Sequence, residues 1–357
     1  MLRFGIIGAG VIGGVHARTL ARLPGRATLV AVAGRSPDRA RALAAEHGCD
    51  WHATARELLA RPDLDAVCVC VPSGLHAGIG EAALRAGKHV LVEKPLEVSL
   101  AAADRLIGTA RSTGRTLGVV LQHRFDPAAR YLYDAVRAGT LGALTSAHAE
   151  VPWWRSQGYY DSGRWRGTAR LDGGGAVMNQ GIHTLDLLGW VMGEAVEVTA
   201  HTALLAHRGL DVEDTAAAVV RFANGALATV LATTAAYPGR TARLAVHGTR
   251  GSAVLDDDRM AYFHARTDGE SADPYGAYGA GDRSAGLPLR YDDERDPTGM
   301  PAAPHRDQLA DFCDAVEHGR PPAVGGQEAR RSLALTLALY ESARTGRTVR
   351  PDGTRAP

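Results

Sequence analysis

The sequence predicts an α/β fold in two parts: a doubly wound parallel sheet, then an α+β domain with an open, mainly antiparallel sheet. Strand-like and helix-like segments alternate up to Arg124, whereas several strands follow one another directly in the second half. A chain of 357 residues is also long enough for two hydrophobic cores. We therefore expect one domain over residues 1–124 and a second over residues 125–357.

The first part has the pattern of repeated strand-and-helix units. Apolar, β-branched runs predict strands at Leu2–Ile7, Thr28–Ala33, Ala66–Val71, His89–Glu93 and Thr116–Leu121. Helical spacing of apolar residues predicts helices at Gly14–Arg22, Pro37–His47, Ala77–Ala86 and Leu100–Thr113, the last with Ser99 as its N-cap. Such alternation builds a parallel sheet that binds its ligand at the carboxyl ends of the strands.

The second part combines a few helices with a run of strands. The expected helices are Pro127–Ala138 and Ala176–Met192, and the expected strands are Leu144–Val151, Val196–Leu205, Thr215–Phe222, Ala226–Ala235, Thr241–His247 and Ala253–Leu255. Asn224-Gly225 is a strong hairpin signal. Residues 265–304 predict a long loop that is either functional or mobile, and residues 305–345 predict two closing helices that pack on the core. We expect helices on one face of this sheet and an oligomer interface on the other.

The composition argues against several classes of partner. Forty basic side chains balance 39 acidic ones, so no overall field favours nucleic acid or an anionic membrane. The cysteines, Cys49, Cys68, Cys70 and Cys313, fit neither a disulfide framework nor a zinc spacing, and we expect buried, inert thiols. The chain enters a strand directly at Leu2 without a signal-peptide pattern, and no apolar stretch reaches membrane-spanning length. We therefore expect a cytoplasmic protein.

A glycine motif follows the first expected strand. In Gly8-x-Gly10-x-x-Gly13, the first glycine permits a tight turn, the second lets backbone N–H groups approach a pyrophosphate, and the third lets the helix pack on the strand. Val11 and Ile12 begin that helix, whose N-terminus carries partial positive charge. This context is typical of a Rossmann domain and predicts a nicotinamide dinucleotide as cofactor.

The end of the second strand bears on the choice between NAD and NADP. Glycine, Gly34, stands where an NAD site usually places an acid, and Arg35 with Ser36 can hold a 2′-phosphate by charge-assisted bonds. This pattern favours NADP(H). The alternative is an NAD site, in which Asp38 binds the ribose from a displaced position and Arg35 is a solvated surface charge.

Further cofactor contacts are expected where other strands end. Pro72 follows the expected strand Ala66–Val71 and directs the chain into a loop. In this loop, Ser73 and His76 are assigned to the nicotinamide ribose, and the alternative for His76 is a cap of the following helix. Glu93, Lys94 and Gln122 stand at the ends of the next two strands and are assigned to the cofactor as well. Lys94, held extended before Pro95, can also stabilise the alkoxide that develops as hydride leaves carbon, unless it is only a surface lysine.

A second chemical signal is a histidine behind three glycines. Gly173-Gly174-Gly175 leads into a helix on which Asn179, His183 and Asp186 share a face, and the glycines suggest close approach of a ligand. His183 can accept a proton near neutral pH, with Asp186 orienting its ring. A core histidine is the structural alternative, and no metal is expected, because two ligands without a third make a poor site.

Taken together, these motifs resemble the Gfo/Idh/MocA family of NAD(P)-dependent sugar and cyclitol oxidoreductases. The resemblance rests on Gly8–Gly13, Glu93-Lys94-Pro95 and Gly173–Asp186, and it extends over nearly the whole chain. It implies a Rossmann domain followed by an open-sheet domain, a functional lysine at Lys94, a general acid/base at His183, and assembly into homodimers or homotetramers. Many members carry Asp four residues before the histidine, where this chain has Asn179, which cannot relay a proton.

The expected substrate is a small sugar-like molecule. Aromatic rings stack on the apolar faces of sugar rings and arginines hold hydroxyl or carboxylate groups, which assigns Trp153, Arg155, Tyr160, Arg164 and Arg166 to substrate binding together with Asn179. The expected reaction moves hydride between a ring carbinol carbon and nicotinamide. The alternatives are a redox-neutral glycosidase-type enzyme that oxidises its substrate transiently and a non-catalytic NADP-binding regulator.

Overall fold

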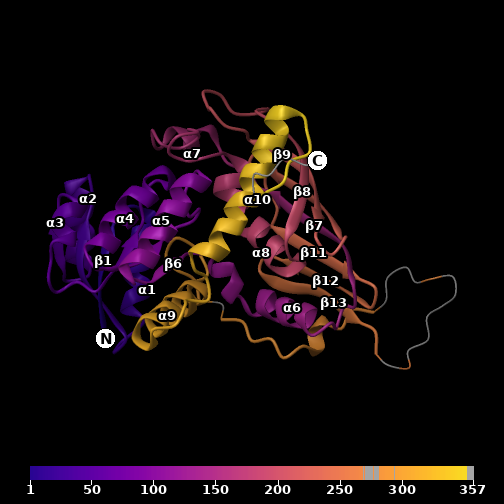
Figure 1. Cartoon of the computed structure of the whole chain (residues 1–357), viewed down its shortest axis with the longest axis horizontal. Helices are drawn as coiled ribbons and strands as arrows, with labels where there is room; N and C mark the ends of the chain where they lie inside the picture. The colour runs from indigo at the N-terminus through magenta and orange to yellow at the C-terminus, as the bar shows by residue number, and fades with distance from the viewer. Residues whose placement is uncertain (268, 270–275, 277–280, 293, 352–357) are drawn as a thin grey trace. The chain divides into compact units, whose positions relative to one another are not determined.

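The computed structural model describes residues 1–267, 269, 276, 281–292 and 294–351, and Figure 1 shows the helices and strands along the chain. Two compact units are formed from discontinuous segments. The N-terminal unit comprises Met1–Phe125, Thr168–Gly173 and Asp292–Leu333. The C-terminal unit comprises Asp126–Gly167, Gly174–Tyr291 and the chain from Ala334 onward.

The N-terminal unit is built on a six-stranded parallel sheet with the strand order β3-β2-β1-β4-β5-β6. Its strands are β1 (Leu2–Ile7), β2 (Ala27–Ala33), β3 (Asp50–His52), β4 (Ala66–Val69), β5 (His89–Val92) and β6 (Leu117–Val119). Its helices are α1 (Val11–Ala21), α2 (Pro37–Glu46), α3 (Ala55–Leu59), α4 (His76–Arg85), α5 (Leu100–Thr113) and α9 (Ala302–His318). The order is that of a doubly wound Rossmann sheet, as predicted.

Local signals account for most of these elements. Ser99 caps α5, since its hydroxyl accepts a hydrogen bond from Ala102 N at 3.3 Å. Strand β3 and helix α3 were not predicted, because three residues give too short a strand pattern and five too short a helical one. Helix α3 nevertheless has a capping box, in which Thr54 and Glu57 satisfy each other's backbone N–H groups.

The first closing helix belongs to the core of the N-terminal unit. On α9, Phe312 packs against Phe4 of β1 with ring centroids 6.2 Å apart. The segment before α9 is also attached to this unit, because Arg18 of α1 donates to both carboxylate oxygens of the buried Asp296. Part of the expected 265–304 loop therefore packs on α1, and residues 268, 270–275, 277–280 and 293 of that loop lie outside the described residues.

The C-terminal unit contains a seven-stranded sheet with the order β13-β12-β11-β7-β10-β9-β8, in which only β7 and β10 pair in parallel among the described strands. Its strands are β7 (Leu144–Pro152), β8 (Ala195–Ala203), β9 (Thr215–Phe222), β10 (Leu227–Thr233), β11 (Arg243–Gly248), β12 (Gly251–Asp256) and β13 (Arg259–Ala265). Its helices are α6 (Pro127–Arg137), α7 (Gln157–Asp161), α8 (Ile182–Met192) and the C-terminal part of α10 (Gly326–Thr345). This mainly antiparallel sheet confirms the predicted fold class.

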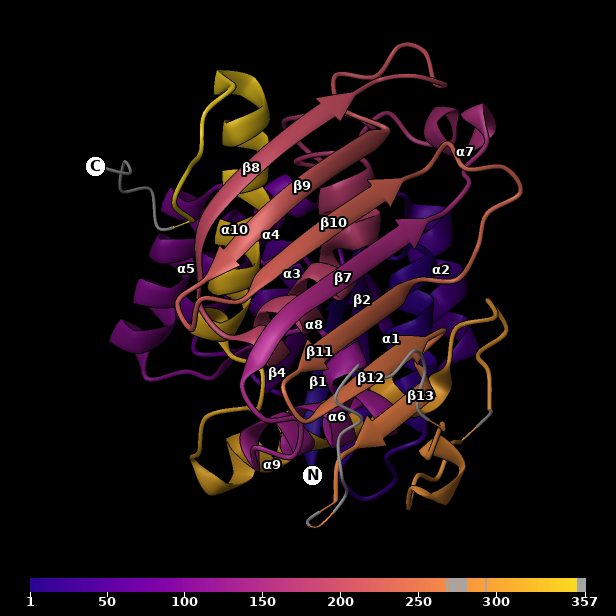
Figure 2. The same ribbon diagram turned by 90° about the vertical axis from the view of Figure 1, so that its right-hand side faces the viewer.

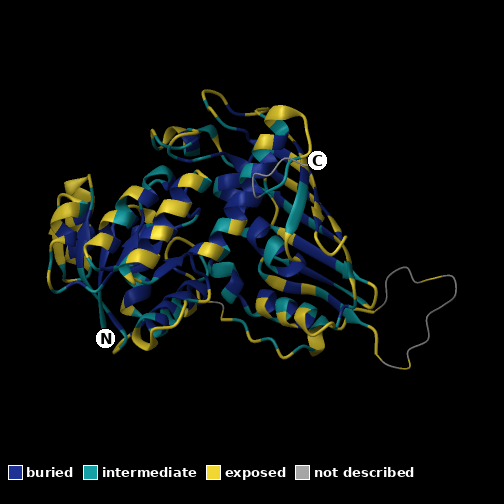
Figure 3. Ribbon diagram, viewed as in Figure 1, coloured by how far each residue is buried: buried dark blue, intermediate teal, exposed yellow. Residues whose placement is uncertain are grey.

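One face of this sheet is open. In Figure 2 the sheet faces the viewer, and α6 and α8 lie behind it. Strands β9 and β10 alternate between buried and exposed residues over most of their length, and Figure 3 shows the buried residues gathered on the strands and on the helices that cover them. The open face carries three large apolar side chains, Val219, Leu227 and Leu231, which are 50%, 45% and 36% exposed. Contiguous exposed apolar side chains of this kind often mark a surface for contact with another protein.

Two other features of this unit bear on the predictions. The Asn224-Gly225 turn joins β9 and β10 as expected, with Gly225 at a φ of +88°. The helix predicted over Ala176–Met192 instead begins with a π-helical turn over Ala176–Gly181, followed by α8. Such a turn leaves no mark in the hydrophobic period, and it is often found at functional sites.

All four cysteines are free, and Cys68, Cys70 and Cys313 are buried while Cys49 is half-buried. No helix among the described residues combines the length and apolar character that crossing a bilayer requires.

Candidate active site

The glycine motif forms a tight loop between β1 and α1. Gly8 has a φ of +116°, and a Cβ there would lie 2.1 Å from the carbonyl oxygen of Cys70, so only glycine fits. A Cβ on Gly13 would lie 2.1 Å from the oxygen of Gly8, which explains the close contact of helix and loop. A Cβ on Gly10 would meet nothing within 4 Å. The side of the loop at Gly10 is therefore open.

This open side fits a dinucleotide. Gly10 is the N-cap of α1 and offers no side-chain cap to the first-turn N–H groups, so these donors are free to bind a pyrophosphate. Val11 is 68% exposed at the same helix end, an unusual position for a valine unless a ligand covers it, whereas Ile12 packs against the core. The backbone of residues 10–13 would hold the phosphates.

The loop after β2 lies beside this motif. A Cβ on Gly34 would come within 3.3 Å of the Cβ of Ala9 and 3.4 Å of its nitrogen, so the chain here is close against the glycine loop. Arg35 is exposed and has no hydrogen-bond or ion-pair partner in the described part of the chain. Ser36 is the N-cap of α2, but its hydroxyl makes no capping bond. A cationic side chain and an unused hydroxyl therefore flank the start of a helix whose first turn also carries Asp38.

The loop after β4 is held by side chains that point inward. Ser73 is buried at the start of a 3-10 turn over Ser73–Leu75. His76, expected to contact the ribose, is also buried, with Nδ1 2.7 Å from the carbonyl oxygen of Pro95 and Nε2 2.9 Å from that of Val71. Both ring nitrogens are thus engaged by main chain. This geometry argues against a contact between His76 and the ribose. His76 instead connects the loop after β4 to the loop after β5. Pro72, in the loop after β4, is half-buried.

Glu93 is likewise turned away from the open edge. It is buried, and His16 of α1 donates from Nε2 to its Oε1 at 2.7 Å. Burial disfavours the charged imidazole, but interactions with Cys68 and with the Glu93 carboxylate raise the pKa of His16 to about 10. Burial by itself favours the neutral acid, but His16 holds the pKa of Glu93 below its usual value. The expected cofactor contact of Glu93 is therefore replaced by a buried ion pair directly before Lys94.

Lys94 and Gln122 remain at the carboxyl edge of the sheet. Lys94 is half-buried, and the Lys94-Pro95 peptide is cis. Gln122 begins a short 3-10 turn after β6, and its Oε1 is buried with no hydrogen-bond partner in the described structure. An unpartnered buried acceptor at the edge where a Rossmann domain binds its ligand fits an amide or hydroxyl donor of a nicotinamide nucleotide.

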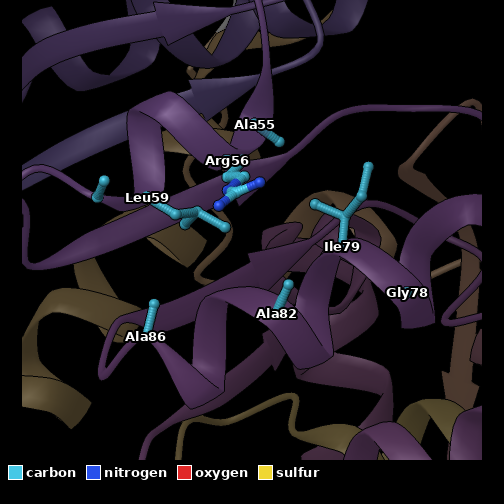
Figure 4. A pocket seen from close by; sticks show the side chains of 8 residues that line it. Ala55, Arg56, Leu59, Gly78, Ile79, Ala82 and Ala86 are labelled. Carbon is cyan, nitrogen blue, oxygen red and sulfur yellow. The ribbon is translucent and has the colours of Figure 1, made fainter.

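A groove elsewhere on this unit does not coincide with these residues. It lies between α3 and α4 and encloses about 350 Å³ (Figure 4). It is lined by Ala55, Arg56, Leu59, Ala60, Gly78, Ile79, Ala82 and Ala86. Not one of the residues assigned to the cofactor contributes to it.

In the C-terminal unit, Asn179 and His183 stand out by their exposure. Every other residue from Gly174 to Leu188 is buried, and these two alone are half-exposed. Asn179 lies in the π-helical turn and His183 in the first turn of α8. Asp186, one turn further, is buried. The helix therefore presents a histidine and an amide together, four residues apart, on its accessible side.

Two of the three glycines before this helix have a different role from the one expected. A Cβ on Gly174 would lie 2.2 Å from the hydroxyl oxygen of Tyr340, and a Cβ on Gly175 would lie 1.7 Å from the carbonyl oxygen of Glu213. These glycines admit protein groups rather than a ligand. Close packing from Tyr340 of α10 and from Glu213, just before β9, determines their identity.

The aromatic segment after β7 is organised around Tyr159. Arg166 donates to the Tyr159 hydroxyl at 2.7 Å, and Gln180 donates to it at 2.9 Å. The guanidinium groups of Arg155 and Arg166 lie 5.2 and 4.3 Å from the centre of the Tyr159 ring. Arg155 also donates to Gln180 Oε1 at 2.9 Å. Gln180, the neighbour of Asn179, therefore ties the arginine segment to the histidine helix.

The other assigned residues of this segment lie in different environments. Tyr160 is buried, its hydroxyl hydrogen-bonded to Thr234 at 2.8 Å, so it packs the segment instead of facing a substrate. Trp153 is half-buried against the core with Arg155 5.2 Å from its ring centre, and Arg164 is exposed. The structure thus groups Trp153, Arg155 and Arg166 with Tyr159, and it leaves Arg164 outside that group.

Several organising residues were missed by sequence reasoning. Tyr159 and Gln180 were passed over beside Tyr160 and Asn179, although each immediately adjoins an assigned residue. Glu213 and Tyr340 carry no motif, and a pair of acids before an apolar strand looks like an ordinary strand start. Their contacts with residues 175–178 join positions far apart in sequence, which only the tertiary structure reveals.

A Rossmann sheet with an open glycine loop, and a mixed-sheet unit with a half-buried histidine at the start of α8, are together typical of a nicotinamide-dependent oxidoreductase.

The chain belongs to the Gfo/Idh/MocA family. Residues 2–121 match the oxidoreductase family with NAD-binding Rossmann fold, and residues 129–254 match the GFO/IDH/MocA C-terminal domain. The chain is 30% identical to the myo-inositol 2-dehydrogenase of Thermotoga maritima, with 98% of each protein covered. It is 32% identical to the 1,5-anhydro-D-fructose reductase of Ensifer adhaerens, with 97% of each covered.

A solved structure agrees with this placement. The WlbA dehydrogenase from Bordetella pertussis in complex with NADH and UDP-GlcNAcA superposes with a TM-score of 0.86 at 28% identity, covering 98% of this chain and 97% of that one. The predicted family, fold and oxidoreductase class are confirmed.

Proposed function

We propose that this protein is an NADP(H)-preferring dehydrogenase or reductase of a sugar, sugar derivative or cyclitol. The observation that carries the proposal is the joint exposure of Asn179 and His183 in an otherwise buried stretch. The names of the relatives support the substrate class, since they include a myo-inositol dehydrogenase, an anhydrofructose reductase and a dehydrogenase bound to a UDP-sugar acid.

The proposed reaction consists of a hydride transfer, for which the cofactor is needed, and a proton transfer, for which the protein supplies His183. When bound, the nicotinamide takes up or gives the hydride of a ring carbinol carbon. An imidazole nitrogen of His183 takes the hydroxyl proton during oxidation and returns it during reduction. The ammonium of Lys94 stabilises negative charge on the same oxygen. Asn179 binds a substrate hydroxyl without moving a proton, so His183 carries the proton transfer alone.

The arginine segment supplies the remaining recognition. Trp153 offers an aromatic face, and Arg155 and Arg166 offer donors held in place around Tyr159. Planar guanidinium groups suit vicinal hydroxyls or a carboxylate. The substrate class in this proposal is therefore a ring with several hydroxyls, with or without an acid group.

The preference for NADP(H) rests on the loop after β2. Arg35 has no partner among the described residues, and the Ser36 hydroxyl makes no capping bond, so both are available to a 2′-phosphate. No acid occupies position 34. We further propose a homodimer or homotetramer formed through the open sheet face, and a cytoplasmic location consistent with four free cysteines.

The test is a spectrophotometric screen of the purified enzyme with NADP+ and NAD+ against free sugars, cyclitols, glycosides and nucleotide sugars. Net growth of reduced cofactor with one of these classes supports the proposal. Product formation from a glycoside without net reduced cofactor identifies a redox-neutral enzyme, and cofactor binding without turnover on any class identifies a regulator. His183→Ala is expected to lower turnover at least about 100-fold while cofactor binding persists. Asn179→Ala should mainly raise KM.

A further inference from the structure

We propose that the adjacent acids Glu213 and Asp214 are positioning residues for the substrate half of the site, with Glu213 fixing the helix of Asn179 and His183 and Asp214 fixing Arg155. This inference rests on the proposed function for its kinetic consequence. It assigns two buried carboxylates that touch no reacting group to two separate tasks.

Glu213 satisfies the start of the histidine helix. The carboxylate accepts from Gly175 N at 3.0 Å and from Val177 N at 2.9 Å, and the backbone carbonyl of the same residue accepts from Ala176 N at 3.2 Å. Three consecutive N–H groups thus share one acceptor residue. A helix start leaves such donors without intrahelical partners, and the glycine before this helix has no side chain to cap them.

Tyr340 completes the cap. Its hydroxyl donates to Glu213 Oε1 at 2.9 Å and accepts from Met178 N at 3.0 Å. Glu213 and Tyr340 together therefore satisfy the N–H groups of residues 175–178. Because Gly174 and Gly175 leave no room for a Cβ beside these two residues, the helix start cannot shift without losing bonds or colliding. Asn179 is the next residue, so its position follows directly from this cap.

Asp214 fixes the segment that carries Arg155. It is fully buried and accepts from the backbone N–H groups of Leu205, Ala206 and His207 at 2.9, 2.8 and 3.1 Å. His207 Nδ1 lies 3.0 Å from the same carboxylate, and His207 Nε2 lies 2.8 Å from the carbonyl oxygen of Arg155. A chain of contacts runs from Asp214 through His207 to the main chain of Arg155.

The two acids serve separate parts because their carboxylates have different partners. Glu213 and Asp214 directly precede β9, and the Glu213 carboxylate accepts from the N–H groups of residues 175 and 177, whereas the Asp214 carboxylate accepts from those of residues 205–207. Glu213 therefore controls the group that transfers a proton, and Asp214 controls a group that binds substrate. Misplacement of a reacting group by about 1 Å can cost about 100-fold in rate, whereas loss of a ground-state contact raises KM.

The kinetic experiment compares Glu213→Gln, Tyr340→Phe and Asp214→Asn in the full-length enzyme, with Glu341→Gln as control. Glu341 adjoins Tyr340 and is exposed on α10, so its change removes a carboxylate without touching the cap. Glu213→Gln should lower kcat about 10- to 100-fold with KM within about threefold. Asp214→Asn should raise KM about tenfold with kcat within about threefold. The dissociation constant for NADPH should stay unchanged in every variant.

Amide hydrogen exchange at residues 175–178 provides a readout that does not depend on activity. Exchange there should be faster in Glu213→Gln and Tyr340→Phe, and unchanged in Glu341→Gln and in Asp214→Asn. Unchanged exchange in Glu213→Gln overturns the cap, and a Glu213→Gln variant that changes only KM overturns its assignment to proton transfer. If instead His183→Ala keeps full turnover while the exchange results hold, the proposed function fails and the cap stands.

Discussion

At the scale of single residues, burial separates the chemical groups from the groups that support them. Lys94, Asn179 and His183 are half-exposed, whereas Glu93 and His76, which stand in the same motifs, are buried and bonded to protein. Buried charges need partners, and Glu93 finds one in His16, 77 positions away in the chain. A motif therefore contains both reacting and positioning residues, and exposure distinguishes them.

Arg35 is the residue that we expect to decide cofactor preference. Arg35→Ala should weaken NADP(H) binding about 10- to 100-fold and NAD(H) binding much less, because hydrogen bonds to a charged phosphate are worth about 1.5–3 kcal/mol. Fluorescence titration with both reduced cofactors measures this. Arg39→Ala, which changes a second exposed arginine, this one on α2, is the matched control. An equal loss for both cofactors, or a wild type that prefers NAD(H), contradicts the assignment.

Sequence reasoning was most successful for residues whose role is set by nearby backbone. The places of Gly8, Gly10 and Gly13 follow from the strand, turn and helix around them, and the structure shows the expected close contacts. It was least successful for Tyr160 and His76, since the direction in which a loop side chain turns depends on partners elsewhere in the fold. Whether the remaining assigned residues bind substrate or cofactor stays a prediction.

At the scale of elements, the helix that carries His183 depends on what precedes it. Its period predicts one continuous helix, but the structure has a π-helical turn over Ala176–Gly181 before α8. Hydrophobic spacing does not register one extra residue in a turn, and it does not reveal that the cap comes from Glu213, just before β9, and from Tyr340 of α10. The parallel strands and their helices were predicted well, because their patterns are long and local.

Two glycines of this region should respond in opposite ways to the same change. Gly174→Ala should lower the free energy of unfolding by about 1–3 kcal/mol, because the new Cβ would lie 2.2 Å from the Tyr340 hydroxyl. Gly189→Ala on α8 meets nothing within 4 Å and should be neutral or stabilise by about 0.4–1 kcal/mol. Thermal and denaturant unfolding measure both. A Gly174→Ala variant as stable as the wild type shows that the glycines are not required for packing.

At the scale of the whole molecule, the order of the two folds was predicted from the sequence, whereas the discontinuous composition of the units was not. Residues 168–173 and 292–333 belong to the N-terminal unit although they follow strands or helices of the other. Gly74 shows the reason, since its N–H donates to Leu171 O at 3.0 Å and a Cβ there would meet Arg170 O at 2.1 Å. A segment that packs on the N-terminal unit after part of the other unit has been formed depends on contacts between residues far apart in the sequence, which local patterns do not encode.

The open sheet face should hold copies of the chain together. Leu231→Glu places a charge within the exposed apolar group on β9 and β10, and we expect it to shift the protein to a smaller species in sedimentation velocity. Leu205→Glu, at a leucine that is 71% exposed outside the sheet, should leave the assembly unchanged. A wild-type monomer, or an intact oligomer in Leu231→Glu, refutes the interface.

The close approach of Gly34 to the glycine loop also limits how cofactor preference can be redesigned. The usual route to an NAD enzyme is an acid at the end of β2, but any side chain at position 34 must begin with a Cβ only 3.3 Å from that of Ala9. The loop that approaches the phosphates would have to yield before the new carboxylate could reach a ribose. The ability of the loop at Ala9 to shift by a few tenths of an ångström therefore decides whether position 34 accepts an acid, and the same condition applies to a lineage that drifted between the two cofactors.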